Sequence, residues 1–544
     1  MQEFLDSGIL TIATFLPVAG ALLLCLLPGA RTREIRFVAL AASLATFVVS
    51  LGIWWRFDGS SALFQYVVDV AWIPSFGIGY RMGVDGISLF LVLLSTLLTP
   101  VAIAASWSIT NRVREYFVFM LLLEAGMIGV FVALDFFLFY FFWEAMLVPM
   151  YFLIGIWGGE RRIYAATKFV LYTMAGSVLM LVAIFTLYLL HGRVTGNYTF
   201  AYEPIVDAIS GGALVLTPGE EVWLFLAFFA AFAIKVPLFP LHTWLPDAHV
   251  EAPTAGSVLL AGVLLKMGTY GLVRFSLPLF PEASSMLAPL VAGLALAGII
   301  YGALVAMVQP DMKKLVAYSS VSHLGFVVLG IFGSSVMGLE GSVYQMLSHG
   351  VSTGALFLLV GVLYDRRHTR LIADYGGIAH RMPVFAAVFL LVALSSIGLP
   401  GLNGFVGEFL ILAGTFLVRP AWAVVGALGV ILSAVYMLWM YQRVVFGEVS
   451  RPENETLRDL SGRELAMLIP LAVLIVWMGV YPATFLGPMD ASIERLADRV
   501  QRNETDLALD VRWRIFEVGP VRLEVPVPTL ERRPPTTGYR TEGR

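Results

Sequence analysis

The sequence predicts an all-α polytopic membrane protein with about 14 transmembrane helices. Three observations predict this class: 59% of the 544 residues are hydrophobic, 13% are charged, and the mean hydropathy is +0.84. A soluble domain carries about 25% charged residues. The composition therefore excludes a soluble globular protein, a disordered chain and a fibrous one. The net charge of −3 gives no sign of nucleic-acid binding.

The apolar stretches define the expected organisation of the chain. A spanning helix needs about 20 mostly apolar residues, and such stretches lie near residues 8–28, 37–55, 85–107, 116–134, 136–157, 166–190, 221–241, 255–277, 286–308, 314–333, 342–364, 384–414, 421–447 and 465–487. We group them as helices 1–3 (residues 1–115), helices 4–8 (116–277), helices 9–13 (286–447) and helix 14 (465–487). A polar C-terminal tail follows over 488–544. In that tail, alternation over 511–518 and 521–527 predicts a small β-hairpin.

Positive charge is distributed unequally between alternate loops. The loops on one side hold eighteen Lys and Arg, whereas the opposite loops hold five: Arg56, Arg81, Arg193, Arg274 and Arg419. Cytoplasmic loops carry the excess of Lys and Arg, so the first side is expected to be cytoplasmic. Both termini are then expected on the outer, periplasmic side of a bacterial inner membrane.

Seven ionisable residues fall inside the apolar stretches: Glu124, Glu144, Lys235, Lys266, His323, His349 and Glu408. An ionisable group at membrane depth is costly and is a functional hypothesis by default. The chain has thirty Arg and five Lys, yet none of the seven is Arg. Arginine stays protonated, whereas Lys, Glu and His can load and release a proton. The structural alternative for each group is a packing hydrogen bond or a static ion pair.

Two of these groups lie beside residues that interrupt helices. One interruption follows Lys235 and the other precedes Glu408; the residues concerned are Pro237, Pro240, Pro400, Gly401 and Gly404. Backbone groups freed at membrane depth are tolerated only where they face protein or a watery cavity. The interruptions fall in helices 7 and 12, which run in opposite directions, and so predict two inverted five-helix repeats, helices 4–8 and 9–13. Two unrelated proline kinks are the alternative.

The segment after the first interruption predicts a proton inlet on the cytoplasmic side. It gathers His242, Asp247, His249 and Glu251 without any Lys or Arg. Metal binding is the alternative interpretation. Because the spacing of these residues matches no common zinc pattern, we expect no metal. The single cysteine, Cys25, excludes an intrachain disulfide and a cluster ligated by cysteines of this chain alone.

Three segments carry a resemblance to a known family: Trp143–Met150, Lys235–Lys266 and Gly404–Phe409. In combination they resemble the antiporter-like membrane subunits of respiratory complex I, over helices 3–14. The resemblance implies a proton-translocating membrane-arm subunit of an NADH-quinone oxidoreductase. It implies L-like and N-like antiporter subunits on either side, an indirect link to the peripheral redox arm, and lipid around the chain. No cofactor is expected in this chain; FMN, iron–sulfur clusters and quinone are expected in partner subunits.

The resemblance also implies roles for individual residues. Lys235 is similar to the central proton carrier of the first repeat, and Glu144 to the partner that forms an ion-pair switch with it. Lys266 resembles the link between the two half-channels, His323 and His349 resemble members of the hydrated central axis, and Glu408 resembles the outward terminal donor. Glu124 fits an additional acidic site.

Three other classes stay open at this point. The first is a subunit of a multi-subunit sodium/proton antiporter, although related subunits usually carry lysine where this chain has Glu408. The second is a membrane redox protein in which His323 and His349 hold a b-type haem. That hypothesis leaves Lys235, Lys266 and Glu408 unexplained. The third is a passive structural subunit.

Overall fold

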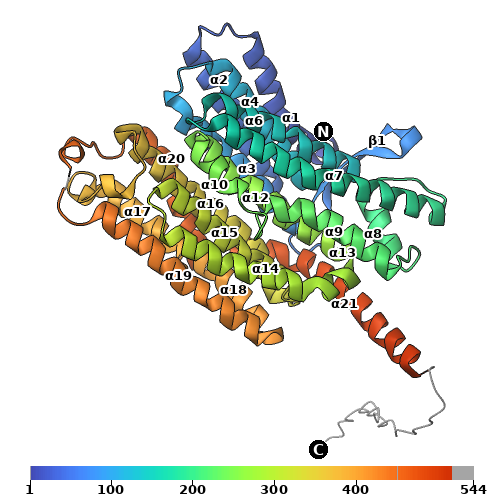
Figure 1. The fold of residues 1–544 in the computed structure, drawn as a ribbon. Coiled ribbons are helices and arrows are strands. Elements are labelled where there is room, and N and C mark those ends of the chain that lie inside the picture. Colours follow the sequence, from blue (N-terminus) through green and yellow to red (C-terminus); the bar gives the residue numbers. More distant parts are fainter. Residues whose placement is uncertain (1, 450, 517–544) are drawn as a thin grey trace, which may run out of the picture. The chain divides into compact units, whose positions relative to one another are not determined.

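The computed structural model describes residues 2–449 and 451–516, and the helices up to residue 503 form one compact unit (Figure 1). Its elements are α1 (Gln2–Leu26), α2 (Thr32–Trp55), β1 (Gln65–Ile73), β2 (Ile78–Val84), α3 (Gly86–Ala105), α4 (Val113–Val132), α5 (Phe136–Ala145), α6 (Leu147–Trp157), α7 (Arg162–Thr195), α8 (Tyr202–Ser210), α9 (Pro218–Lys235), α10 (Trp244–Glu251), α11 (Thr254–Leu259), α12 (Leu265–Gly271), α13 (Leu277–Leu279), α14 (Pro281–Met307), α15 (Met312–Ile331), α16 (Val336–Arg367), α17 (Pro383–Ser396), α18 (Asn403–Val418), α19 (Pro420–Val445), α20 (Gly462–Val480) and α21 (Ala483–Phe516).

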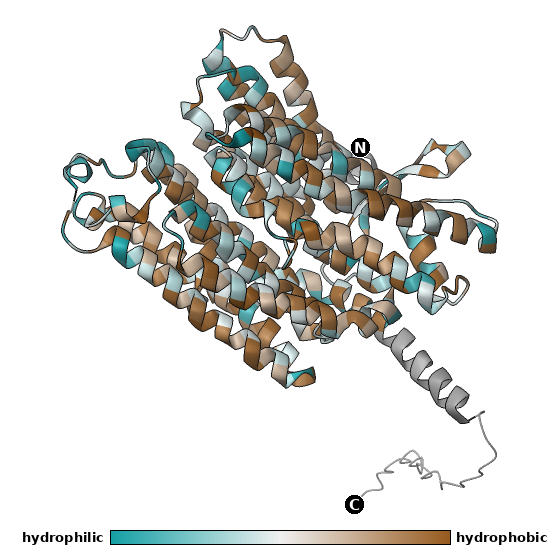
Figure 2. Cartoon of the chain, in the orientation of Figure 1, coloured by the Kyte–Doolittle hydropathy of each residue, from teal (hydrophilic) through white to brown (hydrophobic). Residues whose placement is uncertain are grey.

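The predicted class, a helical membrane protein, is confirmed. Within the described residues, 12 helices are long and apolar enough to cross a membrane, and α17 and α18 are two shorter apolar helices. Figure 2 shows hydrophobic residues along the lengths of the helices and hydrophilic ones gathered at loops. The count of fourteen spans and the inverted repeats stay predictions.

Burial divides the helices into an inner and an outer set. The apolar window of the segment 254–279 is 100% buried inside the protein, and so is that of α16, whereas that of α7 is 39% buried. On α7, Leu171, Val178 and Val182 are exposed, as expected of side chains that contact lipid. The inner helices carry Lys266 and His349, so protein rather than lipid surrounds these groups.

Both predicted interruptions coincide with helix ends. The helix α9 ends at Lys235 and α10 begins at Trp244, with a cis peptide between Phe239 and Pro240. The helix α17 ends at Ser396 and α18 begins at Asn403. Between them Gly398 and Gly401 have φ of 74° and 90°, a region that favours glycine. Lys235 therefore lies at a helix end, and Glu408 lies one turn inside the helix that follows a break.

A third break, which was not predicted, lies beside Glu144. The helix α5 ends at Ala145 and α6 begins at Leu147, with only Met146 between them, so the predicted span 136–157 remains one apolar span, Phe136–Trp157, with a local interruption. Pro149, in the first turn of α6, lacks the N–H that would bond the carbonyl of Ala145. That proline was the available signal in the sequence.

The C-terminal region departs from its prediction. The predicted helix 14 over 465–487 is divided, because α20 ends at Val480 and α21 begins at Ala483, directly after Pro482. The expected strand over 511–516 was wrong, since α21 continues to Phe516. Val511 and Ile515 are four residues apart, a spacing that fits a helix as well as a strand. The rest of that expected hairpin lies outside the described residues.

The structure also contains a two-stranded antiparallel sheet, β1–β2, which the sequence did not predict. Asp135 anchors this sheet. This carboxylate accepts hydrogen bonds from Gly79 N at 3.0 Å and Arg81 NH1 at 2.8 Å, and it caps α5 through Phe137 N and Leu138 N. Burial raises the pKa of Asp135, and these donors together with the Arg81 charge oppose that rise. One side chain thus joins the hairpin to the start of α5.

We expect Asp135→Asn to loosen the hairpin, because an amide presents donors where Gly79 N and Arg81 already donate. Loss of a buried charge-assisted bond costs about 2 kcal/mol, or roughly thirtyfold in local opening. Hydrogen exchange of the β1–β2 amides measures this. Asp69→Asn is the matched control, because Asp69 binds the same arginine but is 61% exposed. Equal exchange in the two variants would contradict the anchor.

Candidate functional site

A line of four titratable side chains crosses the buried interior between α12, α16, α15 and α18. Lys266 Nζ lies 2.6 Å from His349 Nδ1, the rings of His349 and His323 have centroids 5.8 Å apart, and His323 Nδ1 lies 2.8 Å from Glu408 Oε1. All four residues are at most 3% exposed. We call this set the buried relay. The structure thus brings together four of the seven residues singled out in the apolar stretches.

Irregular helix geometry places Lys266 at one end of the buried relay. Two π-helical turns, Leu260–Leu264 and Leu272–Ser276, flank the α12 segment that carries it. The ammonium of Lys266 donates to the carbonyl of Ala261, five residues earlier. Isolated π-turns occur frequently at functional sites, and no sequence pattern predicted these two.

Polar neighbours hold the other end of the buried relay. Gln345 Nε2 donates to Glu408 Oε1 at 3.3 Å, and Tyr436 Oη lies 3.2 Å from His323 Nε2. Gly407 lies directly against Gln345, so that any larger residue at 407 would displace the amide. Both nitrogens of His323 therefore face protein partners, which leaves neither free to bind a haem iron.

A second polar group adjoins His349 on α16. Asn403 Nδ2 donates to the carbonyl of Ser348 at 3.2 Å and to Ser352 Oγ at 3.0 Å, and Ser352 Oγ lies 2.6 Å from Ser395 Oγ. This group ties the break before α18 to the helix that carries His349. It fixes His349 on α16 relative to Glu408 on α18.

Lys235 lies apart from its predicted partner Glu144. Its ammonium is 3.7 Å from Met146 Sδ, 5.2 Å from the Trp143 ring centroid and 5.5 Å from that of Phe169. None of the ion pairs among the described residues joins Lys235 to Glu144, although the carboxylate lies within electrostatic range. Aromatic faces stabilise the cation here.

Close helix packing brings Lys235 near the start of the buried relay. The helices α9 and α12 contact each other. Gly268 lies against the backbone oxygen of Phe232 and the backbone nitrogen of Val236, where a Cβ would collide. Lys235 is next to Val236, and Lys266 is two residues from Gly268. The absence of a side chain at 268 therefore sets the separation of the two lysines.

Glu124 does not join the buried relay. It is fully buried in α4, and neither carboxylate oxygen has a hydrogen-bond partner in the described part of the chain.

The four predicted inlet residues do not form one cluster. Asp247 pairs with Lys168 at 2.8 Å, and Glu251 accepts from Arg161 N at 2.9 Å. His242 lies between the rings of Phe239 and Tyr301, whereas His249 stacks on Phe357 at 4.6 Å. The segment has no Lys or Arg of its own, but Lys168 of α7 lies against it through Asp247. Among the residues that the structure describes, no three His, Cys, Asp or Glu side chains lie close enough together to hold a metal ion.

Sequence reasoning missed two buried basic residues by assigning them to loops. Lys313 is 6% exposed and donates to the carbonyl of Ala252 at 2.6 Å. Arg274 lies inside the buried segment 254–279 and pairs with Asp85. Arg274 corrects the expectation that no arginine lies among the groups at membrane depth. Its position within the apolar stretch 255–277 was the available signal.

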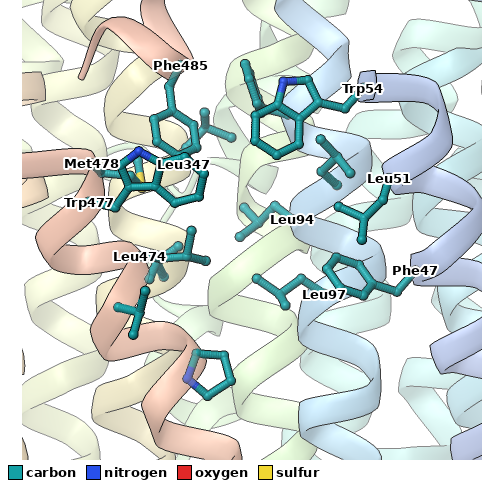
Figure 3. A pocket seen from close by; sticks show the side chains of 15 residues that line it. Phe47, Leu51, Trp54, Leu94, Leu97, Leu347, Leu474, Trp477, Met478 and Phe485 are labelled. Atoms are coloured by element: carbon teal, nitrogen blue, oxygen red, sulfur yellow. The ribbon is translucent and has the colours of Figure 1, made fainter. Parts of the chain in front are cut away.

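An apolar cavity of about 320 Å³ lies beside the site but outside the buried relay (Figure 3). Its lining comes from α2, α3, α16, α20 and the start of α21, and includes Trp54, Leu94, Leu347, Leu474 and Trp477. No titratable side chain lines it. It offers a proton no group to bind.

The fold and the site define a class: a many-helix membrane protein with broken helices and titratable groups at their breaks, as in transport subunits. A family model described as NADH:quinone oxidoreductase/Mrp antiporter, TM, matches residues 133–435, and one described as NADH-ubiquinone oxidoreductase chain 4, amino terminus, matches residues 34–133. The chain belongs to this NADH:quinone oxidoreductase/Mrp antiporter family, which confirms the resemblance seen in the sequence.

Individual relatives agree with the family. The chain is 50% identical over 505 residues to NADH-quinone oxidoreductase subunit M of Rhodobacter capsulatus, covering 92% of this chain and 98% of that protein. It is 46% identical to NADH-ubiquinone oxidoreductase chain 4 of Arabidopsis thaliana, covering 88% and 95%. A chain of respiratory complex I from Thermus thermophilus with bound NADH matches at 34% identity and a TM-score of 0.80, covering 90% and 99%.

We expect Gly268→Ala to destabilise the protein by about 1–3 kcal/mol, because the new methyl group would collide with the backbone of α9. The midpoint of thermal unfolding in detergent measures this loss. Gly293→Ala is the matched control: Gly293 is also inside a helix, and its added Cβ meets nothing within 4 Å. Equal midpoints for the two variants would show that α9 and α12 are not held at this separation.

Proposed function

We propose that this chain is the proton-translocating membrane subunit of an NADH-quinone oxidoreductase, in the place that subunit M, or chain 4, has in its relatives. The observation that carries the proposal is the buried relay from Lys266 through His349 and His323 to Glu408. Groups within hydrogen-bond reach can pass a proton along. A passive structural subunit has no need of two hydrogen-bonded pairs of titratable groups in its core.

The relay supports a path with a defined order. Lys235, at the end of α9, takes up a proton and passes it across the α9–α12 contact to Lys266. Lys266 hands it to His349 at 2.6 Å, a bridging water passes it from His349 to His323, whose ring centroids are 5.8 Å apart, and His323 hands it to Glu408 at 2.8 Å. In the expected orientation α18 continues from Glu408 towards the outer side. The path thus runs sideways through the core before it runs outwards.

Glu144 supplies the control of loading. It lies beside the break between α5 and α6 and does not contact Lys235 in this arrangement. An approach of its carboxylate stabilises protonated Lys235, and its withdrawal favours release of the proton. The break at Met146, which touches the lysine through its sulfur, is the place where such a movement reaches Lys235. Glu124, with no partner of its own, is an additional acidic site.

A polar cavity supports uptake from the cytoplasmic side. It has a volume of about 140 Å³ and is lined by residues that include Glu251, Lys313, Tyr364 and Arg370. His249 is buried two residues from Glu251. Asp247 lies in the same short helix, α10, and His242 lies two residues before it. These groups make the region after the first break the inlet.

The energy source belongs to partner subunits. The relatives are subunits of NADH-quinone oxidoreductases, and this sequence holds one cysteine and no nucleotide-binding motif. FMN, iron–sulfur clusters and quinone therefore belong to the partners. L-like and N-like antiporter subunits are its neighbours, lipid covers the exposed apolar faces, and the peripheral arm acts through the neighbours. The host membrane is a bacterial inner membrane.

A subunit of a multi-subunit sodium/proton antiporter is the second candidate, because the family model covers both kinds of protein. Glu408 favours the oxidoreductase, since related antiporter subunits usually carry lysine at this place. A pH gradient that depends on sodium, in vesicles without NADH-quinone oxidoreductase, would favour the antiporter.

We expect Glu144→Gln to abolish both NADH oxidation and proton pumping in membrane vesicles while the complex still assembles. The amide removes the charge that controls Lys235 and keeps the shape. Lys235→Arg should lose pumping through this subunit as completely as Lys235→Ala, because arginine does not release its proton. Vesicle acidification and NADH oxidation measured together test both.

Asp69→Asn serves as the control, because Asp69 is exposed and its ion-pair partner, Arg81, does not belong to the buried relay. Unchanged rates with Glu144→Gln would make that residue structural. Full pumping with arginine at 235 would end the carrier role of Lys235.

The proposed orientation predicts opposite labelling of two introduced cysteines. In a Cys25→Ser background, Ser60→Cys should react with a membrane-impermeant maleimide added outside intact cells, whereas Thr456→Cys should react only after the cells are opened. Both positions are exposed, so access decides the result. The reverse pattern would place both termini on the cytoplasmic side.

A further inference from the structure

One buried ion pair, Arg274 with Asp85, takes no part in the proposed path. Arg274 NH2 bonds Asp85 Oδ1, and the two residues are 6% and 3% exposed. Asp85 also caps α3, where it accepts from Ser88 N. Burying two charges costs several kcal/mol per ion, and an apolar pair of similar size is often as stable. Stability alone is therefore a weak reason for this pair.

Aromatic rings and residues of α21 surround the pair, and beside it lies a small cavity of about 20 Å³ that Asp85, Arg274 and Arg495 help to line. The guanidinium lies over the rings of Phe64, Tyr202 and Tyr270 at 5.0–6.0 Å from their centroids. Arg495 of α21 donates to the carbonyl of Ala62, next to this cluster, and Ser492 Oγ accepts from Gly86 N. The cation is thus fixed in position, and arginine keeps its charge at any physiological pH.

Arg274 lies between Lys266 and the expected outer surface. Lys266, Tyr270 and Arg274 follow one another at four-residue intervals, so Arg274 is about 12 Å further along the helix than Lys266. Arg274 Nε donates to Tyr270 Oη at 3.1 Å, while its other end bonds Asp85. A proton moving outwards from Lys266 would therefore meet the guanidinium before the carboxylate.

Tyr270 offers no way around the cation. Its hydroxyl donates to the carbonyl of Phe131 at 3.1 Å and accepts from Arg274. The lateral partner of Lys266, in contrast, is a histidine nitrogen at 2.6 Å. The two directions open to a proton on Lys266 are thus unequal: an imidazole on one side and a fixed positive charge on the other.

We propose that Arg274, held by Asp85, is an electrostatic barrier that closes the direct outward route from Lys266 and so directs the proton sideways to His349. Fixed arginines exclude protons and cations from other membrane pores by the same repulsion. Arg274 is a positioning residue, because it acts through Lys266 and does not carry the proton. The inference rests on the proposed function, and its test is a passive leak that needs no NADH oxidation.

The test compares loss of each partner of the pair in vesicles that hold the assembled complex. A pH gradient is imposed with turnover inhibited, and its decay is followed with a fluorescent pH probe. Arg274→Gln should speed the decay at least about threefold and lower the protons pumped per NADH, whereas Asp85→Asn, which keeps the cation, should not.

The asymmetry separates a barrier from a merely structural contact. A structural pair predicts similar effects of Arg274→Gln and Asp85→Asn, and that result would overturn the proposal. If a single variant fails to assemble because it leaves a buried charge, the double variant Asp85→Asn, Arg274→Gln replaces it. The double variant has lost the cation, so it should leak as Arg274→Gln does.

Two controls fix the location of the leak. The first control neutralises another ion pair, in which Arg366 NH1 lies 2.7 Å from Glu464 Oε1. The decay of the pH gradient should be unchanged in that variant. Adding Lys266→Ala to Arg274→Gln should abolish the leak, and a leak that persists would contradict a route through Lys266. The Glu144→Gln experiment tests redox coupling separately, so failure of the barrier and failure of the proposed function give different results.

Discussion

The cost of holding an ionisable side chain away from water governs the interior of this protein. Such a group needs a charge or hydrogen-bond partner within reach. On the inner helices the partners of four of these groups include other titratable groups: Lys266 meets His349, and His323 meets Glu408. The contacts that make the groups tolerable at this depth are the same contacts that let a proton pass. Stability and transport thus depend on one set of distances.

Broken helices supply the polar backbone that a regular helix withholds. The carbonyl of Ala261, beside a π-turn, accepts from Lys266. In the break before α18, Gly398 and Gly401 adopt positive φ angles, which let the backbone turn between the two helices. Asn403 ties that break to α16. The irregular segments are therefore not defects in packing. They lie where charged groups need partners that the apolar side chains around them cannot give.

Hydropathy and proline positions predicted the spans, the interruptions and the residues of the buried relay. They could not predict which groups touch. Because the apolar window of α16 is buried all round, its sequence has no polar face to show which neighbour His349 meets. The separation of Lys235 from Glu144, the burial of Arg274 and the anchoring of β1–β2 by Asp135 all depend on contacts distant in sequence. A charged residue at the end of an apolar stretch reads as a loop residue until the helix packing is known.

The division between lysine and arginine gains its meaning from these contacts. Lys235 and Lys266 lie among aromatic rings, a sulfur and an imidazole, with no carboxylate in contact to fix their charge. Arg274 and Arg366, in contrast, are each bound to a carboxylate. The lysines, which can release a proton, thus lie in the middle of the molecule, and the arginines, whose charge is fixed, lie towards its ends. A proton that enters such an interior meets releasable groups in the middle, and its direction follows from where the fixed charges stand.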